Sequence, residues 1–189
     1  MKTLLIDNKS KLIVNLKVSL PGEVTVKPWN SLSGTQTDAF DLIVLSGGSA
    51  FSVEGNEDKL KAELELIHQN KKPLIGICFG CELIVKAFGG TLERMAEPKK
   101  GNISIKINPQ FRQLYDGLES FEVYENHHWR IKDLPTCFDV VASSEHGHEL
   151  IKHRTLPIFG LQFHPEKVVA AGQGDYILKK TIEDATQQQ

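Results

Sequence analysis

Short apolar runs alternate with amphipathic segments along the first half of the chain. Each run is bounded by turn-forming residues, as strands usually are. The predicted strands cover residues 3–8, 23–28, 40–45 and 74–77. Between and after them, apolar side chains recur at helical spacing, and the predicted helices cover residues 9–20, 56–70 and 82–88. This alternation predicts a doubly wound α/β fold with a mostly parallel central sheet and flanking helices.

The pattern changes after residue 91. Residues 101–107 alternate strictly between polar and apolar side chains, which is typical of an antiparallel strand. The further strand candidates are residues 121–124, 138–142 and 156–163, and a last helix is predicted over about 175–185. We therefore expect an antiparallel extension of the parallel sheet. Because no linker, repeat or low-complexity segment divides the sequence, we expect a single domain over residues 1–189.

Composition excludes several classes of function. The chain has 189 residues, of which 40% are hydrophobic, and this is enough for a sizeable core. A net charge of −2 favours neither nucleic acid nor a membrane surface as a partner. No apolar run reaches the length of a membrane span, and Asp7 breaks the first run too early for a signal peptide. The three cysteines fit a reducing compartment, so we expect a cytoplasmic protein.

A Gly-x-Cys-x-Gly motif, formed by Gly76, Cys78 and Gly80, stands between a predicted strand and a predicted helix. It is the thiol form of the nucleophile elbow, a sharp turn in which glycines let the backbone double back. Such a turn sets the Cys78 sulfur at a helix N-terminus, where the helix dipole favours the thiolate. A buried cysteine at a strand end explains the motif equally well. The spacing of Cys78 and Cys81 also fits a redox pair.

Two other segments offer what a nucleophilic thiol needs. His164 and Glu166 are two residues apart at the end of a predicted strand, so both side chains can face one pocket, where Glu166 would orient the imidazole. The Ser-Gly-Gly run at 46–48 offers uncrowded backbone N–H groups at another strand end. The N–H groups of Gly48 and Phe79 are candidates for an oxyanion hole. Taken alone, each segment fits an ordinary loop or turn.

Together these motifs resemble the class I glutamine amidotransferases over nearly the whole chain. The motifs that carry the resemblance are Ser-Gly-Gly at 46–48, Gly-Ile-Cys-Phe-Gly at 76–80 and Phe-His-Pro-Glu at 163–166. Within the family, residues 45–48 and 125–127, the latter followed by Leu-Pro at 134–135, are most similar to the glutaminase subunits of GMP synthetases.

The resemblance implies a flavodoxin-like sheet and a specific chemistry. Cys78 would be the nucleophile, His164 the base and Glu166 its orienting partner, with Gly48 and Phe79 forming the oxyanion hole. The implied reaction converts glutamine to glutamate and ammonia through a thioester, without a cofactor. The implied partner is a synthetase subunit that accepts the ammonia, which points to GMP synthesis.

Two positions depart from the family pattern. The family usually has His-Gln after the elbow, where this chain has Cys81 and Glu82. The Gln normally helps to bind the substrate, whereas Glu82 adds a charge that could pair with the α-ammonium group or raise the thiol pKa. Asn126 and His127 match the family, which implies a substrate-binding role for them. Trp129 replaces a common acidic residue, and we expect it to pack as a half-buried aromatic.

One further run, Glu145-His146-Gly147-His148-Glu149, looks like a metal-binding cluster. A glycine separates its two histidines, and no third group of ligands lies nearby in the sequence. We interpret the run as a polar turn and expect no metal or cofactor.

Three functions fit these observations. The first is the glutaminase, and the second is the same thiol chemistry on another amide, such as a γ-glutamyl conjugate. The altered residue at Glu82 motivates the second. The third is a non-catalytic regulatory module of the same fold, motivated by the missing family residues at Glu82 and Trp129.

Overall fold

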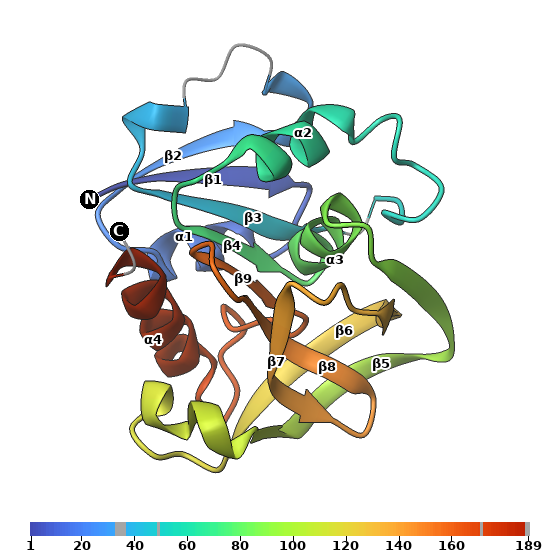
Figure 1. Ribbon diagram of the computed structural model, residues 1–189, viewed down its shortest axis with the longest axis vertical. Helices are drawn as coiled ribbons and strands as arrows, with labels where there is room; N and C mark the ends of the chain where they lie inside the picture. The colour runs from blue at the N-terminus through green and yellow to red at the C-terminus, as the bar shows by residue number, and fades with distance from the viewer. Residues whose placement is uncertain (33–36, 49, 171, 188–189) are drawn as a thin grey trace.

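A mixed sheet forms the centre of the computed structural model (Figure 1). The structure describes residues 1–32, 37–48, 50–170 and 172–187. Five strands are parallel to one another: β1 (Lys2–Asn8), β2 (Glu23–Pro28), β3 (Leu42–Gly48), β4 (Leu74–Ile77) and β9 (Ile158–Leu161). Antiparallel pairing then adds β5 (Thr91–Ile107), β6 (Ser120–Asp133), β7 (Phe138–Ser144) and β8 (Gly147–His153).

The strand order of the described residues is β2-β1-β3-β4-β9-β8-β7-β5-β6. The doubly wound sheet with an antiparallel extension is therefore confirmed. Two strands, β5 and β6, are much longer than predicted. Beyond their alternating segments they pair with each other as a long, partly exposed hairpin. The polar residues of that hairpin lack the apolar alternation by which strands are predicted. The run at 145–149 is a turn only at 145–146, and β8 begins at Gly147.

Helices cover both faces of the parallel strands. The α-helices are α1 (Ile13–Ser19), α2 (Lys61–Gln69), α3 (Phe79–Ala87) and α4 (Gly174–Gln187), and short 3₁₀ helices span Trp29–Ser31, Thr37–Ala39 and Pro109–Tyr115. The predicted helices at 9–20 and 56–70 are shorter than expected, and the one after the elbow begins at Phe79. No helix in the described ranges combines the length and apolarity that a bilayer crossing requires.

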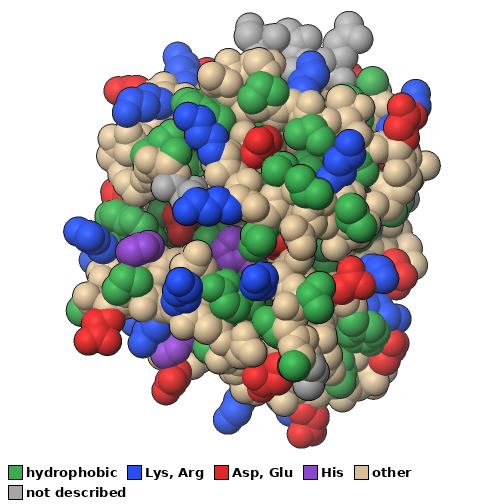
Figure 2. All heavy atoms as spheres, turned by 180° about the vertical axis from the view of Figure 1, so that it is seen from behind, with side chains coloured by type: hydrophobic (Ala, Val, Ile, Leu, Met, Phe, Trp, Pro, Cys, Tyr) green, Lys and Arg blue, Asp and Glu red, His purple; other side chains and the backbone are tan. Residues whose placement is uncertain are grey.

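Two apolar clusters hold the layers together. Leu5 belongs to the cluster that contains residues of α1 and α4, and Leu4 belongs to the cluster that contains residues of α2 and α3. Adjacent residues fall on opposite faces because side chains alternate along a strand. On the face shown in Figure 2, basic and acidic side chains are interspersed over the surface.

The carboxyl ends of β3, β4 and β9 lie side by side, because the three strands are parallel neighbours. Ligands of doubly wound sheets bind outside this edge. The Ser-Gly-Gly run forms the end of β3, and the elbow and the segment with His164 follow the ends of β4 and β9, so the topology brings all three motifs to one edge.

Packing beside the elbow leaves no room for a side chain at Gly160. A Cβ there would lie 2.6 Å from Sγ of Cys81 and 3.0 Å from Cγ1 of Ile151. We expect Gly160→Ala to lower the free energy of unfolding by roughly 1–3 kcal/mol, as overpacked core substitutions do. Urea denaturation measures this loss. Adding Cys81→Ala removes the nearest clash, so the double variant should lose less than the sum of the single losses. Additive losses would contradict this packing.

Candidate active site

Cys78 occupies a strained turn between β4 and α3. Its backbone has φ 48° and ψ −101°, a region that residues other than glycine rarely adopt. The turn closes tightly around it: a Cβ on Gly76 would lie 2.4 Å from the carbonyl carbon of Gly80, and a Cβ on Gly80 would lie 2.5 Å from the carbonyl oxygen of Leu45. The flanking glycines of the motif are therefore required by the close approach of backbone to backbone.

Hydrogen bonds on both sides hold the elbow in place. The Cys78 N–H donates to the carbonyl oxygen of Leu161 in β9 at 2.6 Å. The Glu82 N–H donates to the carbonyl oxygen of Cys78 at 3.0 Å and begins the helical pattern of α3. The predicted strand-to-helix elbow is thus present, with the cysteine immediately before the first residue of the helix.

His164 and Glu166 meet, although not in the way that strand alternation predicted. β9 ends at Leu161, and the Lys167 N–H donates to the carbonyl oxygen of His164 at 3.2 Å, which closes a turn. This turn brings Oε1 of Glu166 to 3.0 Å from Nδ1 of His164. The His164 N–H also donates to the carbonyl oxygen of Tyr124 at 2.9 Å, which ties the turn to β6.

The Cys78 thiol and the His164 imidazole lie close enough to each other to change each other's pKa. Burial raises the pKa of the Cys78 thiol, and His164 offsets only part of this increase. Burial also opposes charging of the imidazole, but Cys78 and Glu166 together raise the pKa of His164 well above its usual value. Burial therefore opposes the thiolate that the helix N-terminus is expected to favour. Transfer of the thiol proton to His164 creates the thiolate beside a compensating positive charge.

A cavity of about 190 Å³ opens beside Cys78. It is lined by six residues that the sequence singled out, namely Gly48, Cys78, Phe79, Glu82, Asn126 and His127. Phe51, Ser52, His128 and Trp129 complete the lining. Trp129 is partly buried and packs against the cluster that contains α2 and α3, as expected of a packing aromatic. Phe51 and Ser52 belong to no motif, so sequence patterns offered no signal for them.

Glu82 lies buried at this cavity and is only 4% exposed. Burial raises the pKa of its carboxyl group to about 7, although Gln162 and the nearby histidines favour the charged form. The Gln162 amide donates to Oε1 of Glu82 at 3.4 Å. A Glu82 carboxylate would in turn raise the pKa of the Cys78 thiol, in the direction expected from the sequence. Gln162 was missed, although it is only two residues before His164.

Cys81 does not share the environment of Cys78. Its side chain is 1% exposed, and its sulfur would be the nearest neighbour of any side chain at Gly160. Burial raises the pKa of the Cys81 thiol well above its usual value. Both cysteines are free thiols. Unlike Cys78, Cys81 has no imidazole among the described residues acting on it to favour its thiolate, so the pair lacks the second reactive thiol that redox chemistry requires.

Comparison with known proteins gives one consistent family. The family model described as class I glutamine amidotransferase matches residues 4–184. One subunit of the glutamine-hydrolyzing GMP synthase of Methanococcus maripaludis is 37% identical over 139 residues, which cover 72% of this chain and 69% of that protein. The corresponding subunit from Pyrococcus abyssi is also 37% identical over 139 residues, covering 72% of this chain and 71% of that protein.

Solved structures agree with the family. A Thermoplasma acidophilum protein, provisionally assigned as a GMP synthase subunit, matches with a TM-score of 0.86 and 27% identity, covering 99% of this chain and 94% of that one. A glutamine amidotransferase from Thermotoga maritima matches with a TM-score of 0.75 over 97% of this chain and 83% of that one. At 20% identity, the second match supports the fold alone. The resemblance seen in the sequence is therefore confirmed.

Thiol labelling tests the electrostatics of the site. We expect iodoacetamide to modify Cys78 faster than Cys81, because Cys78 borders the cavity and has an imidazole beside it. His164→Asn removes the group that stabilises the thiolate, so labelling of Cys78 at about pH 7 should slow by about tenfold or more. The partly exposed Cys137 serves as the control and should keep its rate. Peptide mass spectrometry measures each rate, and an unchanged Cys78 rate would contradict the assignment.

Proposed function

The chain belongs to the class I glutamine amidotransferase family, and we propose that it hydrolyses the side-chain amide of glutamine with Cys78 as the nucleophile. The observation that carries this proposal is the continuous chain of contacts from the Cys78 thiol through His164 to Glu166. Such a chain supplies a nucleophile, a group that accepts its proton, and a carboxylate that orients that group. It favours the enzyme over a non-catalytic module.

The first half of the reaction forms a thioester. His164 takes the Cys78 proton, and the sulfur attacks the side-chain carbonyl carbon of glutamine. The N–H groups of Gly48 and Phe79, which both border the cavity, stabilise the oxyanion. His164 then returns the proton to the leaving nitrogen, the C–N bond breaks, and ammonia departs.

The second half restores the enzyme. Water attacks the thioester while His164 accepts its proton, and the C–S bond breaks to release glutamate and the Cys78 thiol. The Glu166 carboxylate, 3.0 Å from Nδ1, holds the ring in one orientation and stabilises its charged form in both halves.

A protonated, neutral Glu82 can perform the substrate-binding role of the glutamine that the family usually has at this position. With a pKa of about 7, its buried carboxyl group carries a proton over part of the physiological range. A protonated carboxyl group offers one donor and one acceptor, as a glutamine amide does. Asn126 and His127 border the same cavity and are assigned to substrate binding with Glu82. A neutral Glu82 also removes the main reason to favour a γ-glutamyl conjugate over free glutamine.

The acceptor of the ammonia is a synthetase subunit on a separate chain. This part of the proposal rests on the relatives, which are subunits of glutamine-hydrolyzing GMP synthases from archaea. The ammonia is accordingly used in GMP synthesis, and the protein works where that synthesis takes place, in the cytoplasm.

Glutamate release from glutamine tests the proposed activity. We expect the protein to hydrolyse glutamine, and to do so faster when a GMP synthase subunit that lacks its own glutaminase is added. Cys78→Ser should abolish hydrolysis, and Glu166→Gln should lower kcat by roughly 10²–10⁴-fold, the usual contribution of acid–base machinery. Cys137→Ser is the matched control and should retain full activity. Hydrolysis by Cys78→Ser, or none by the native protein with any synthetase subunit, would overturn the proposal.

The pH dependence of a Glu82 variant tests its neutral role. As pH rises through about 7, Glu82 loses its proton, stops donating and places a negative charge near the thiol. Glu82→Gln cannot lose a proton. The ratio of kcat/KM for Glu82→Gln to that of the native protein should therefore rise with pH, by up to about tenfold per unit above pH 7. The ratio cancels the titration of Cys78 and His164 except for the part that the Glu82 charge itself causes, and that part raises the ratio with pH in the same direction. A ratio independent of pH would contradict the role.

A further inference from the structure

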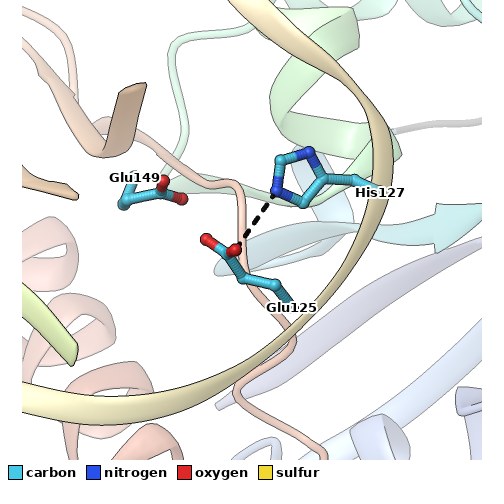
Figure 3. A group of neighbouring side chains, drawn as sticks. All are labelled: Glu125, His127 and Glu149. Atoms are coloured by element: carbon cyan, nitrogen blue, oxygen red, sulfur yellow. Dashed lines mark ion pairs between the residues drawn. The ribbon is translucent and has the colours of Figure 1, made fainter. Parts of the chain in front are cut away.

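Glu125, His127 and Glu149 form a buried cluster next to the candidate active site (Figure 3). Glu125 and His127 belong to β6, and Glu149 belongs to β8. One ligand atom offered by each residue lies within 4.8 Å of those of the others. The three residues are only 0%, 3% and 1% exposed, respectively. Such burial of two carboxyl groups beside an imidazole is unfavourable unless something compensates their charge.

The atoms that face the centre of the cluster are acceptors. Nδ1 of His127 lies 2.7 Å from the carbonyl oxygen of Trp129. Because that oxygen can only accept, Nδ1 carries a proton, and it is Nε2 that faces the carboxyl groups and can offer a lone pair to a cation. Nε2 lies 3.7 Å from Oε2 of Glu125 and points toward it in Figure 3.

These acceptors find no donor in the described part of the chain. Nε2 of His127, both carboxylate oxygens of Glu125 and Oε2 of Glu149 have no hydrogen-bond partner there. Among the described residues, no Lys or Arg forms an ion pair with either carboxyl group. A buried set of acceptors without a donor is stable only if a cation or additional protons occupy its centre.

Hydrogen bonds from outside the cluster orient two of its side chains, His127 and Glu149, in the way that metal ligands are usually oriented. The Trp129 carbonyl fixes the tautomer of His127, and the Ser144 hydroxyl donates to Oε1 of Glu149 at 2.6 Å, which leaves Oε2 for a ligand. Metal-binding histidines almost always donate their second N–H to a carbonyl or carboxylate, and ligating carboxylates are hydrogen-bonded in turn.

We propose that Glu125, His127 and Glu149 bind a divalent transition-metal cation, for which Zn²⁺ is the matching probe. One imidazole nitrogen and two carboxylate oxygens suit Zn²⁺, and three protein ligands leave one position open. Mg²⁺ and Ca²⁺ prefer oxygen ligands alone. A tetrahedral Zn²⁺ site needs ligand atoms about 3.3 Å apart, so the carboxyl groups would have to turn toward the cation when it binds. With Nδ1 bound to the Trp129 carbonyl and Nε2 bound to the cation, His127 would line the cavity through its ring carbons, and Asn126 and Glu82 would supply the polar contacts to the substrate. Cation binding itself does not depend on glutamine hydrolysis.

Glu125 and His127 are two residues apart on β6, but Glu149 lies on β8, so no compact spacing motif marked the cluster. The run at 145–149 contributes only Glu149, while its histidines stay outside the cluster. The expectation of no metal rested on the sequence spacing of that run alone. Contact between β6 and β8, which are not neighbours in the sheet, adds the two ligands from β6.

A shared proton is the competing explanation. Burial and the neighbouring Glu125 raise the pKa of the Glu149 carboxyl group. Without a cation, a proton shared between the two carboxyl groups would remove one of the two buried charges. Zn²⁺ must displace such a proton, so its affinity should increase as pH rises.

Equilibrium dialysis against Zn²⁺, followed by metal analysis, tests the site. The full chain is used after chelator treatment, in a Cys78→Ser background that removes the competing thiol of the active site. We expect one Zn²⁺ per chain and a higher melting temperature with Zn²⁺ than with Mg²⁺. Ser144→Ala should weaken Zn²⁺ binding by about 10–100-fold, as outer hydrogen bonds of metal ligands do. Glu125→Gln and Glu149→Gln should weaken it further.

Glu145→Gln is the matched control, because Glu145 neighbours the cluster in sequence but its side chain is exposed and lies outside it. It should leave Zn²⁺ affinity unchanged. Circular dichroism verifies that each variant folds. If a buried Gln variant fails to fold, the Zn²⁺ affinity of Ser144→Ala still tests the site. Zn²⁺ binding that survives in Ser144→Ala and both Gln variants would overturn the proposal. If the folded parent protein does not bind Zn²⁺, the proposal is overturned. If Glu149→Gln is then also more stable than the parent, the shared proton is the correct explanation.

Discussion

The candidate site depends on one strained turn. Cys78 adopts φ 48° because β4 must end and α3 must begin within a single residue. The backbone there is so close that neither Gly76 nor Gly80 has room for a Cβ. Strain of this kind costs about 1–3 kcal/mol and persists only where the surrounding structure over-determines it. Here the hydrogen bond to β9 and the buried packing of α3 hold the turn, and they place the thiol at the open edge of the sheet.

The same edge explains how distant segments come together. β3 and β9 flank β4 as parallel neighbours, so the residues after their ends surround Cys78. The antiparallel strands contribute from the other side. β6 passes the turn that follows β9, where Tyr124 accepts from the backbone of His164, and it continues along the cavity with Asn126 and His127. The cavity is therefore built between the two halves of one sheet.

Sequence patterns predicted the parallel half well because each of its strands is a short apolar run with clear ends. The elbow, the contact of His164 with Glu166 and the cavity residues Glu82 and His127 were also found from motifs. Sequence patterns did not predict the features that are determined by packing between distant segments. The turn that joins His164 to Glu166, the length of β6 and the burial that raises the pKa of Cys78 depend on contacts between segments far apart in the chain.

Burial has the same effect on two carboxyl groups in and beside the site. Carboxyl groups that lack a cationic partner, such as Glu82 and Glu149, have raised pKa values because burial penalises their charged forms. Glu166, by contrast, is paired with His164. A neutral Glu82 would serve the substrate, and Glu149 would serve a cation, so the same physical effect supports two separate roles.

The central claim is that the Cys78 sulfur becomes acylated by glutamine. Mass spectrometry of protein quenched in acid during turnover, followed by peptide mapping, tests this most directly. We predict a γ-glutamyl group attached to Cys78 and to no other residue. Ammonia release with the acyl group on a different side chain, or with Cys78 unmodified throughout turnover, would contradict it.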